Sequence, residues 1–478
     1  MLCPERLRLW AIAGVAVNLG ILIVGSVRGG GVWFIGSDGY PLPYDFLFFR
    51  AAAIMAERGD AALAYDWAQF QATVRDLLGG REHLIWWPYP PNFFAYLLPL
   101  AWLPYPLAFT TWLVITGAIH VAGMRAALPV RGVVFAALGA PAALFTAQQG
   151  QASFLTVGLL SLSLAMLDRR PWLAGVLLGL VSYKPNLGLV LPVFLLVGGY
   201  WRSVLGAALT VVGLMLVSGL LVGFDAWYAY MRVAPGNIDF VLSPWDVDPT
   251  HLQWTHLQSI YALVFAFTGD VWTATLVHGT VAGLAVLTTA WLWYRQASTG
   301  IRSSAALASS VIVTPYLFGY DTLLLAAAGA FFLNDCLTRG FQPGDRIVIC
   351  LAWILPAGAA LHVVMGTTSG FTPAAALLLL AFIVRRAAVT GSPSPPPVTG
   401  WLWKRCTRGM PNTATCRAAP IGITEPHQIW LRRGFPRSAP PWPVSRRMPA
   451  APAPISTGPH SGRPKPIHEP APDRARVE

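Results

Sequence analysis

Charged residues are scarce in this chain. Asp, Glu, Lys and Arg together make up 11% of its 478 residues, less than half of the roughly 25% that soluble domains carry. Hydrophobic residues reach 55%, and several apolar runs approach or exceed the ~20 residues that a helix needs to cross a bilayer. A soluble globular protein is therefore excluded. We expect an all-α polytopic membrane protein, because a helix satisfies its own backbone hydrogen bonds in lipid.

Cysteine is also sparse, and it comes without a metal-binding pattern. The five cysteines do not have the spacing of a zinc site, and they indicate no disulfide framework. His251 and His256 lie five residues apart with no carboxylate at a metal-ligand spacing. The sequence therefore predicts no metal and no cofactor.

Positive charge is concentrated at the C-terminal end. Residues 391–478 hold 13 Lys and Arg against 4 Asp and Glu, which is +9 of the net +12, and 19 of the 40 prolines. Such a segment, without apolar periodicity, cannot bury enough surface to offset chain entropy. We predict a membrane domain over 1–390 and a disordered, Pro-rich, basic cytoplasmic tail over 391–478. The basic balance of this tail does not indicate a nucleic-acid partner.

Basic residues beside the apolar segments indicate which side each loop faces. Arginines gather at 168–170, 339–346 and 385–386, and such residues favour the cytoplasm. A first outer loop over 28–91 and a second over 224–258 then face the other side. We predict about 11–13 transmembrane helices and a multi-pass protein of the plasma (inner) membrane.

The first outer loop contains seven of the 21 acidic residues. Two of its stretches, DFLFFRAAAIMAERG and DWAQFQATVRDLLGG, begin with Asp and reach Gly at their end, which is typical of a helix. We predict two short amphipathic helices along the membrane surface.

Asp45 heads the first of these stretches, just beyond the first apolar segment. A carboxylate near the membrane surface is suited to deprotonate an acceptor hydroxyl in glycosyl transfer from a lipid phosphate. The alternative is a residue at a helix N-terminus that the helix dipole stabilises. The sequence leaves both open.

Lys184 ends an apolar stretch, GLVSYKPN, and a proline follows it. An ammonium at that depth is costly unless it is paired or reaches the interface. A lipid phosphate on the non-cytoplasmic side is one partner that would satisfy it. A snorkelling lysine is the alternative.

Two further stretches are polar or aromatic. QQGQ, at 148–151, offers amides that can bind sugar hydroxyls or phosphate oxygens, or that can cap a helix at a turn. WWPYPP, at 86–91, offers rings that can stack on sugars, or that can form an interfacial belt.

Five stretches together resemble a known family. In chain order they are YDFLFFRAAA, AYD, YPPNFFAYLLPLAWLP, QGQASFLTVGLLSLSLAML and AGVLLGLVSYKPNLGLVLPVFLL. Their order and spacing resemble glycosyltransferase family 87, from about Asp38 to Arg386. The resemblance implies a membrane-embedded GT-C-like bundle that uses polyprenyl-phosphate sugars, typically mannose.

The resemblance also implies roles for particular residues. Asp45 matches the family's general base, Lys184 the lysine of its Lys-Pro motif, and Gln151 the glutamine of its Gly-Gln motif. We expect Lys184 and Arg50 to bind the donor phosphate. The expected sugar and acceptor ligands are Gln149, Gln151, Tyr89 and His256.

These observations favour an inverting hexosyltransferase that is alpha-mannosyltransferase-like. Its partners would be a polyprenyl-phosphate-linked sugar donor, a glycan or glycolipid acceptor, and membrane lipids, with the active site on the non-cytoplasmic face. A secondary transporter is the main alternative, and it would require paired intramembrane charges and internal repeats. A non-catalytic lipid or glycan flippase is another alternative, and it would not need Asp45.

Overall fold

The computed structural model describes residues 45–83, 86–242, 257–360 and 370–390, together with 9, 12–20, 23, 35 and 39–41. Its described part is helical, with two isolated β-bridges, Ile35 with Pro41 and Leu257 with Phe318. The predicted all-α class is confirmed. The predicted tail and His256 lie outside the described residues, as does much of the second outer loop.

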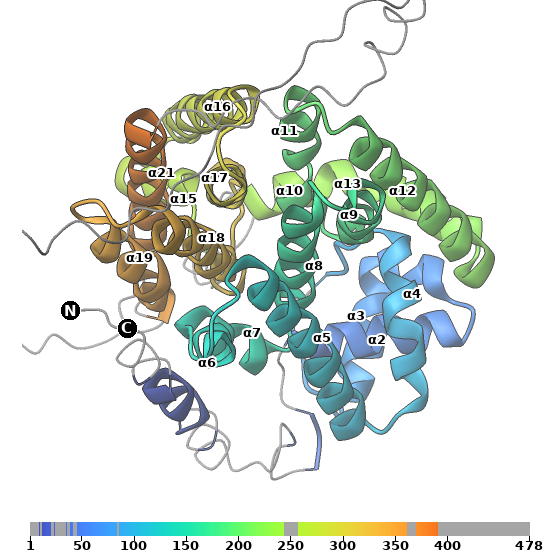
Figure 1. Ribbon diagram of the computed structural model, residues 1–478. Coiled ribbons are helices and arrows are strands. Elements are labelled where there is room, and N and C mark those ends of the chain that lie inside the picture. The colour runs from blue at the N-terminus through green and yellow to red at the C-terminus, as the bar shows by residue number, and fades with distance from the viewer. Residues whose placement is uncertain are drawn as a thin grey trace, which may run out of the picture. The chain divides into compact units, whose positions relative to one another are not determined.

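The helices follow one another through short connections (Figure 1). In the first outer loop and the segment after it they are α2 (Phe46–Glu57), η1 (Ala61–Tyr65), α3 (Trp67–Leu77), η2 (Pro91–Phe93), α4 (Phe94–Leu97) and η3 (Leu98–Trp102). The central part contains α5 (Tyr105–Ala127), α6 (Val133–Leu138), α7 (Pro141–Gln149), α8 (Ser153–Met166), α9 (Pro171–Gly179), η4 (Leu180–Tyr183), α10 (Pro185–Gly188), α11 (Leu191–Val197), α12 (Trp201–Val222) and α13 (Phe224–Leu242). The last part contains α15 (Ile260–Thr268), α16 (Val271–Tyr294), α17 (Thr299–Val313), η5 (Gly319–Thr322), α18 (Leu323–Arg339), α19 (Asp345–Ile354), η6 (Leu355–Ala360) and α21 (Phe371–Thr390).

Five segments of the described part are long and apolar enough to cross a membrane. They are Tyr105–Ala127, Trp201–Val222, Val271–Tyr294, Gly319–Arg339 and Phe371–Val389. Three shorter apolar helices accompany them: Ser153–Met166, Pro171–Tyr183 and Pro185–Val197. The polytopic membrane architecture is therefore confirmed, while the total of 11–13 crossings stays a prediction.

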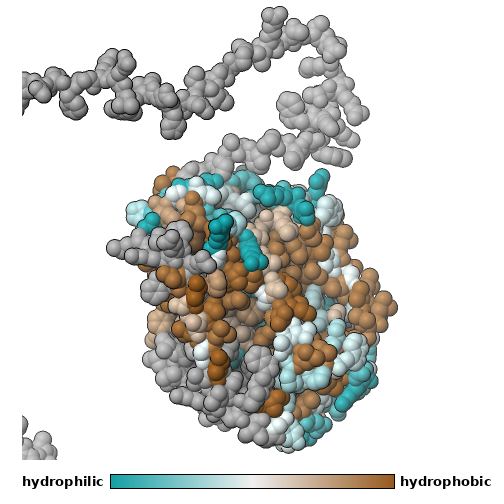
Figure 2. All heavy atoms as spheres, turned by 60° about the horizontal axis from the view of Figure 1, so that its bottom comes forward, coloured by the Kyte–Doolittle hydropathy of each residue, from teal (hydrophilic) through white to brown (hydrophobic). Residues whose placement is uncertain are grey.

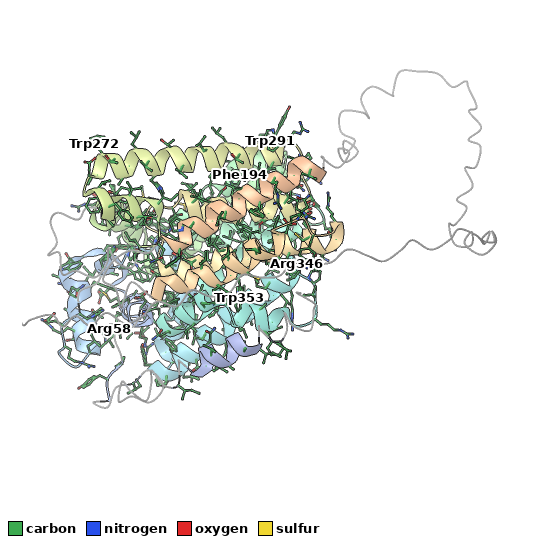
Figure 3. The ribbon with its side chains drawn as sticks, turned by 90° about the vertical axis from the view of Figure 1, so that its left-hand side faces the viewer. Arg58, Phe194, Trp272, Trp291, Arg346 and Trp353 are labelled. Atoms are coloured by element: carbon green, nitrogen blue, oxygen red, sulfur yellow. The ribbon has the colours of Figure 1, made fainter. Side chains whose placement is uncertain are left out.

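Apolar side chains cover much of the surface, as expected of a protein that faces lipid. Figure 2 shows hydrophobic residues over a broad area, with hydrophilic residues gathered toward its upper and lower edges. On α16, Trp272 is 82% exposed. In Figure 3, Trp272 lies at the end of α16 on the side of Arg58, and Trp291 lies at the end on the side of Arg346. Tryptophans at both ends of a span are typical of interfacial anchors.

Helix α8 lies at the centre of the described part. Eleven of its 14 residues are buried, and it packs against α5, α9, α17 and α18. The approach of α5 is close because Gly158 has no side chain: a Cβ there would lie 2.7 Å from the main-chain nitrogen of His120. Helix α8 is therefore packed closely against α5 at Gly158.

The two helices predicted in the first outer loop are present at the predicted positions, but they differ in their environment. Helix α3 is amphipathic, with only Phe70 and Val74 buried. Helix α2 has nine of its 12 residues buried against protein. The reason is the run Phe46–Phe49, which places apolar groups on every side of the helix, and such a helix is buried rather than laid on a surface.

A buried ion-pair network joins α18, α19 and α21. The Arg386 guanidinium donates from Nε to Asp335, at 2.6 Å, and from Nη1 to Asp345, at 2.9 Å. Its Nη2 donates to the main-chain oxygens of Asp335 and Gly340. Arg385 pairs with the second oxygen of Asp345 at 2.8 Å. The two arginines expected on the cytoplasmic side therefore also hold three helices together.

Candidate active site

Asp45 lies directly before α2, yet its side chain makes no capping hydrogen bond to that helix. By contrast, Asp66 caps α3 by accepting from the main-chain nitrogen of Gln69 at 3.0 Å. The Asp45 carboxylate instead accepts from Nε2 of Gln151 at 2.6 Å. A side-chain capping role therefore does not explain Asp45.

Gln151 reaches Asp45 because α7 ends in a tight turn. Gly150 has a φ of +66°, and a Cβ there would lie 2.6 Å from the Cβ of Phe46. Only glycine allows this approach without strain. The other end of the amide is also fixed, since Oε1 of Gln151 accepts from the Tyr89 hydroxyl at 3.1 Å and from the Ala152 main-chain nitrogen at 3.2 Å.

Lys184 lies between η4 and α10, where Pro185 begins the next helix. Its Nζ donates to Oδ1 of Asp321 at 2.6 Å, and the lysine side chain is only 8% exposed. The ring centroid of Tyr320 lies 4.9 Å from the same nitrogen. The structure therefore does not support the snorkelling alternative.

The YPPN stretch holds the segment that precedes Lys184. Nδ2 of Asn92 donates to the Ser182 hydroxyl at 2.8 Å, and Phe93 stacks on Tyr183 with ring centroids 4.6 Å apart. The Tyr183 hydroxyl in turn bonds to Thr156 of α8 at 2.7 Å. The Lys-Pro turn is thus fixed from two sides.

The start of α8 connects the two acidic groups. Gln151 contacts Asp45 from the turn before the helix, and Ser153 at its first position donates to Oδ1 of Asp321 at 2.7 Å. Helix α7 also contacts the Tyr320 loop, because the Thr146 hydroxyl donates to the main-chain oxygen of Tyr320 at 3.3 Å. We call the group formed by Asp45, Gln151, Ser153, Lys184 and Asp321 the carboxylate–lysine cluster.

The surroundings change the acidity of Asp45. Its surface is partly accessible, but protein atoms displace most of the water that would stabilise its charge. Burial raises the pKa of Asp45 from 3.8 to about 6, and the Asp321 charge adds to this rise, while the Gln151 hydrogen bond and the Lys184 charge oppose it. A carboxylate with this pKa is largely ionised at neutral pH and is a stronger base than an ordinary aspartate.

Not every predicted ligand lies in the cluster. Arg50 is five residues along α2 from Asp45, so it points about 140° away, and its guanidinium donates to the main-chain oxygen of Leu100. Gln149 is the half-buried last residue of α7. Tyr89 reaches the cluster through Gln151. His256 lies outside the described residues.

The sequence alone indicates no role for Asp321, Ser153 or Tyr320. Asp321 closes the stretch PYLFGYD at the edge of an apolar segment, and a carboxylate in such a place is a signal of function. What the sequence did not indicate was the pairing of Asp321 with Lys184, which are separated by 137 positions.

The described residues also form an aromatic cavity of about 240 Å³. Among its lining residues are Tyr65, Trp67, Phe70, Trp86 and Trp87, so the predicted aromatic stretch at 86–91 contributes to it. The Tyr65 hydroxyl donates to the main-chain oxygen of Tyr89 at 2.8 Å. The cavity is therefore joined by one hydrogen bond to the residue that holds Gln151.

No group of three or more His, Cys, Asp or Glu side chains is arranged to hold a metal ion within the described residues. The carboxylate–lysine cluster instead offers a base, a cation and amide and hydroxyl groups. These are the groups that a displacement at a carbon atom with an anionic leaving group requires.

Comparison with known proteins supports the family resemblance. Residues 87–315 match the family model described as glycosyltransferase family 87. No curated protein and no solved structure matches the chain. The matched range contains Tyr89, Gln151 and Lys184, while Asp45 and Asp321 lie on either side of it. The resemblance to glycosyltransferase family 87 is confirmed, and it indicates a membrane glycosyltransferase.

Proposed function

We propose that the protein transfers a hexose, in the simplest case mannose, from a polyprenyl-phosphate donor to a glycan or glycolipid acceptor with inversion. The observation that carries this proposal is the carboxylate–lysine cluster. It holds a carboxylate of raised pKa, Asp45, in the electrostatic range of a buried ammonium, Lys184. The family match supplies the reaction class.

In the proposed reaction, the acceptor hydroxyl gives its proton to Asp45 while its oxygen attacks the anomeric carbon of the donor sugar. The bond between that carbon and the phosphate oxygen breaks, and its electron pair leaves with the polyprenyl phosphate. A single displacement inverts the configuration at the anomeric carbon. Gln151 holds one carboxylate oxygen through its amide, so the other oxygen can accept the proton.

Lys184 would stabilise the leaving group. The phosphate gains a negative charge as the bond breaks, and a preorganised cation close to that charge lowers the barrier. The site is also shielded from water, since the Lys184 and Asp321 side chains are 8% and 0% exposed. An electrostatic contact in such surroundings is stronger than the same contact in water.

A secondary transporter remains the second candidate because of one observation. Paired charges within an apolar protein are typical of transporters, and Lys184 with Asp321 is such a pair. The family match favours transfer over transport. The two candidates differ in product: a transferase makes a new glycosidic bond, whereas a transporter moves its substrate unchanged.

The deciding experiment is a transfer assay in membranes that contain the protein. Radiolabelled polyprenyl-phosphate hexoses are supplied with glycan or glycolipid acceptors, and label is followed into an acceptor product that has lost the polyprenyl phosphate. Membranes without the protein are the control. Label that crosses the membrane but stays on its carrier would support transport and overturn the proposed reaction.

A further inference from the structure

We propose that Asp321 is the resident counter-ion of Lys184 and that the lipid phosphate displaces it. Donor binding and product release are then set by a competition between one carboxylate and one phosphate for the same ammonium. This inference rests on the proposed function, and it adds Asp321 as a positioning residue that acts through Lys184.

The first argument is the buried ion pair itself. Lys184 Nζ lies 2.6 Å from Oδ1 of Asp321, and both side chains are almost fully buried. An ammonium in such a place is costly without a partner. In the free protein Asp321 is that partner, so a phosphate that binds Lys184 replaces an existing contact instead of meeting a free cation.

The second argument is that the aspartate is anchored independently of the lysine. Ser153 donates to Oδ1 of Asp321 at 2.7 Å, and the main-chain nitrogen of Asp321 donates to the Phe318 oxygen at 3.0 Å. The lysine has a flexible four-carbon stem. When a phosphate arrives, the carboxylate can therefore stay on Ser153 while the ammonium moves toward the phosphate.

The third argument is the incomplete hydrogen bonding of the Asp321 carboxylate. Oδ2 of Asp321 is buried and has no hydrogen-bond partner among the described residues. A buried carboxylate oxygen without a partner is unfavourable. A hydroxyl of the bound sugar could donate to Oδ2, and this contact would offset the loss of the lysine from Oδ1.

The fourth argument is the balance of charge. With Asp45 and Asp321 ionised and Lys184 protonated, the cluster carries −1, which limits its affinity for any phosphate. During transfer Asp45 takes the acceptor proton, and the cluster becomes neutral while the leaving phosphate gains its charge. When Asp45 then loses that proton to water, the cluster returns to −1 and repels the product phosphate.

The test is Asp321→Asn, which keeps an oxygen for Ser153 and removes the competing charge. The Lys184 ammonium then has no competing carboxylate charge and is available to the phosphate. We expect the product, polyprenyl phosphate, to inhibit transfer about tenfold more strongly, as a charged hydrogen bond would contribute. Donor KM should fall and kcat should fall with it, because release becomes slow. Asp76→Asn is the matched control, since Asp76 is exposed on α3.

A double-variant cycle shows whether the effect acts through the lysine. In a Lys184→Gln background, Asp321→Asn should leave inhibition by polyprenyl phosphate unchanged, because the ammonium for which the carboxylate and the phosphate compete is gone.

Ser153→Ala should change inhibition by polyprenyl phosphate in the opposite direction to Asp321→Asn. Without the serine hydroxyl the carboxylate holds the lysine more strongly, and inhibition should weaken. This variant keeps the proposal testable if Asp321→Asn does not fold.

The outcomes separate this inference from the proposed function. Asp321→Asn with lower activity and unchanged or weaker inhibition would give Asp321 a structural role only and overturn the inference. If the wild type shows no transfer, binding of radiolabelled polyprenyl phosphate to the purified protein tests the competition without turnover. Equal affinity in the wild type and in Asp321→Asn would then count against it.

Discussion

The described part of the molecule contains two buried ionic clusters, and they differ in how completely the oxygens of their buried carboxylates are hydrogen-bonded. In the network around Arg386, three guanidinium nitrogens donate to Asp335, Asp345 and a main-chain oxygen. In the carboxylate–lysine cluster, Lys184 contacts one oxygen of Asp321, and the other oxygen has no partner among the residues that the structure describes. A cluster whose carboxylate oxygens are all bonded stabilises a fold, whereas a buried carboxylate oxygen without a partner is a group that a ligand can use.

The clusters also differ in how the chain builds them. The Arg386 network draws on α18, α19 and α21, within about 50 residues of one another. The carboxylate–lysine cluster brings together Asp45, Gln151, Lys184 and Asp321 from four separate parts of the chain. The predictions below test whether the first cluster serves stability and the second serves chemistry.

The largest effect is expected from Asp45→Asn. The amide cannot take the acceptor proton, so transfer should be abolished while expression and membrane insertion stay intact. In the wild type, activity should rise with pH through about 6, because Asp45 must be ionised and its pKa is raised to about 6. An unperturbed aspartate would place this rise near its usual pKa of about 4.

The pH profile and the variant are measured in the same transfer assay. Asp66→Asn is the matched control, since Asp66 caps α3 and lies outside the cluster. Turnover of Asp45→Asn close to that of the wild type would remove Asp45 from the mechanism.

Lys184→Gln should lower the transfer rate by about 10- to 100-fold, because a charge-assisted contact is worth roughly 1.5–3 kcal/mol. Lys184→Arg should lower the rate less, since arginine keeps the positive charge although its planar guanidinium differs in shape from an ammonium. Donor KM and kcat are measured for all three proteins. Equal kinetics would give the lysine only a structural role and leave the two clusters alike in function.

Arg386→Leu should lower the stability of the protein and leave transfer by the folded protein unchanged. Removing the guanidinium leaves Asp335 and Asp345 buried without their main partner, which should cost about 3–5 kcal/mol of stability. The folded fraction should keep its specific activity. Arg339→Leu is the matched control, because Arg339 pairs with the same Asp335 but is 35% exposed, so its loss should cost about 1 kcal/mol or less.

Both variants are compared by thermal or denaturant unfolding in detergent, together with activity per folded protein. If Arg386→Leu unfolds like the wild type but loses transfer, the network has a role in chemistry that its geometry does not indicate.

The sequence predicted the parts of this architecture that depend on local pattern. The length of the apolar runs predicted a helical membrane protein. Asp and Gly residues predicted the ends of α2 and α3 to within a few residues. The family resemblance singled out Asp45, Gln151 and Lys184, and the structure joins Asp45 to Gln151 and holds Lys184 nearby. These signals need no knowledge of distant contacts.

What the sequence could not provide depends on tertiary packing. The ion pair of Lys184 with Asp321 joins positions that are far apart in the chain. The burial of α2 follows from the residues that pack around it, and the contact of Arg50 with Leu100 depends on where η3 passes. A pattern of residue types indicates that an acid or a cation needs a partner, but it does not name the partner.

The smallest effect is expected from ending the chain after Thr390. Residues 391–478 carry +9 of the net charge and 19 prolines, a composition that contributes little folding energy. Both clusters are formed by described residues between Asp45 and Arg386, which precede this segment in the chain. The transfer rate should therefore stay within about twofold of that of the full chain, and the free energy of unfolding should change by a correspondingly small amount.

Unfolding and the transfer assay are compared for the two chain lengths, with Arg386→Leu as the destabilised reference. A truncated protein that loses stability to the same degree as Arg386→Leu would mean that the tail supports the network. One that folds normally but loses transfer would mean that the tail acts on the carboxylate–lysine cluster.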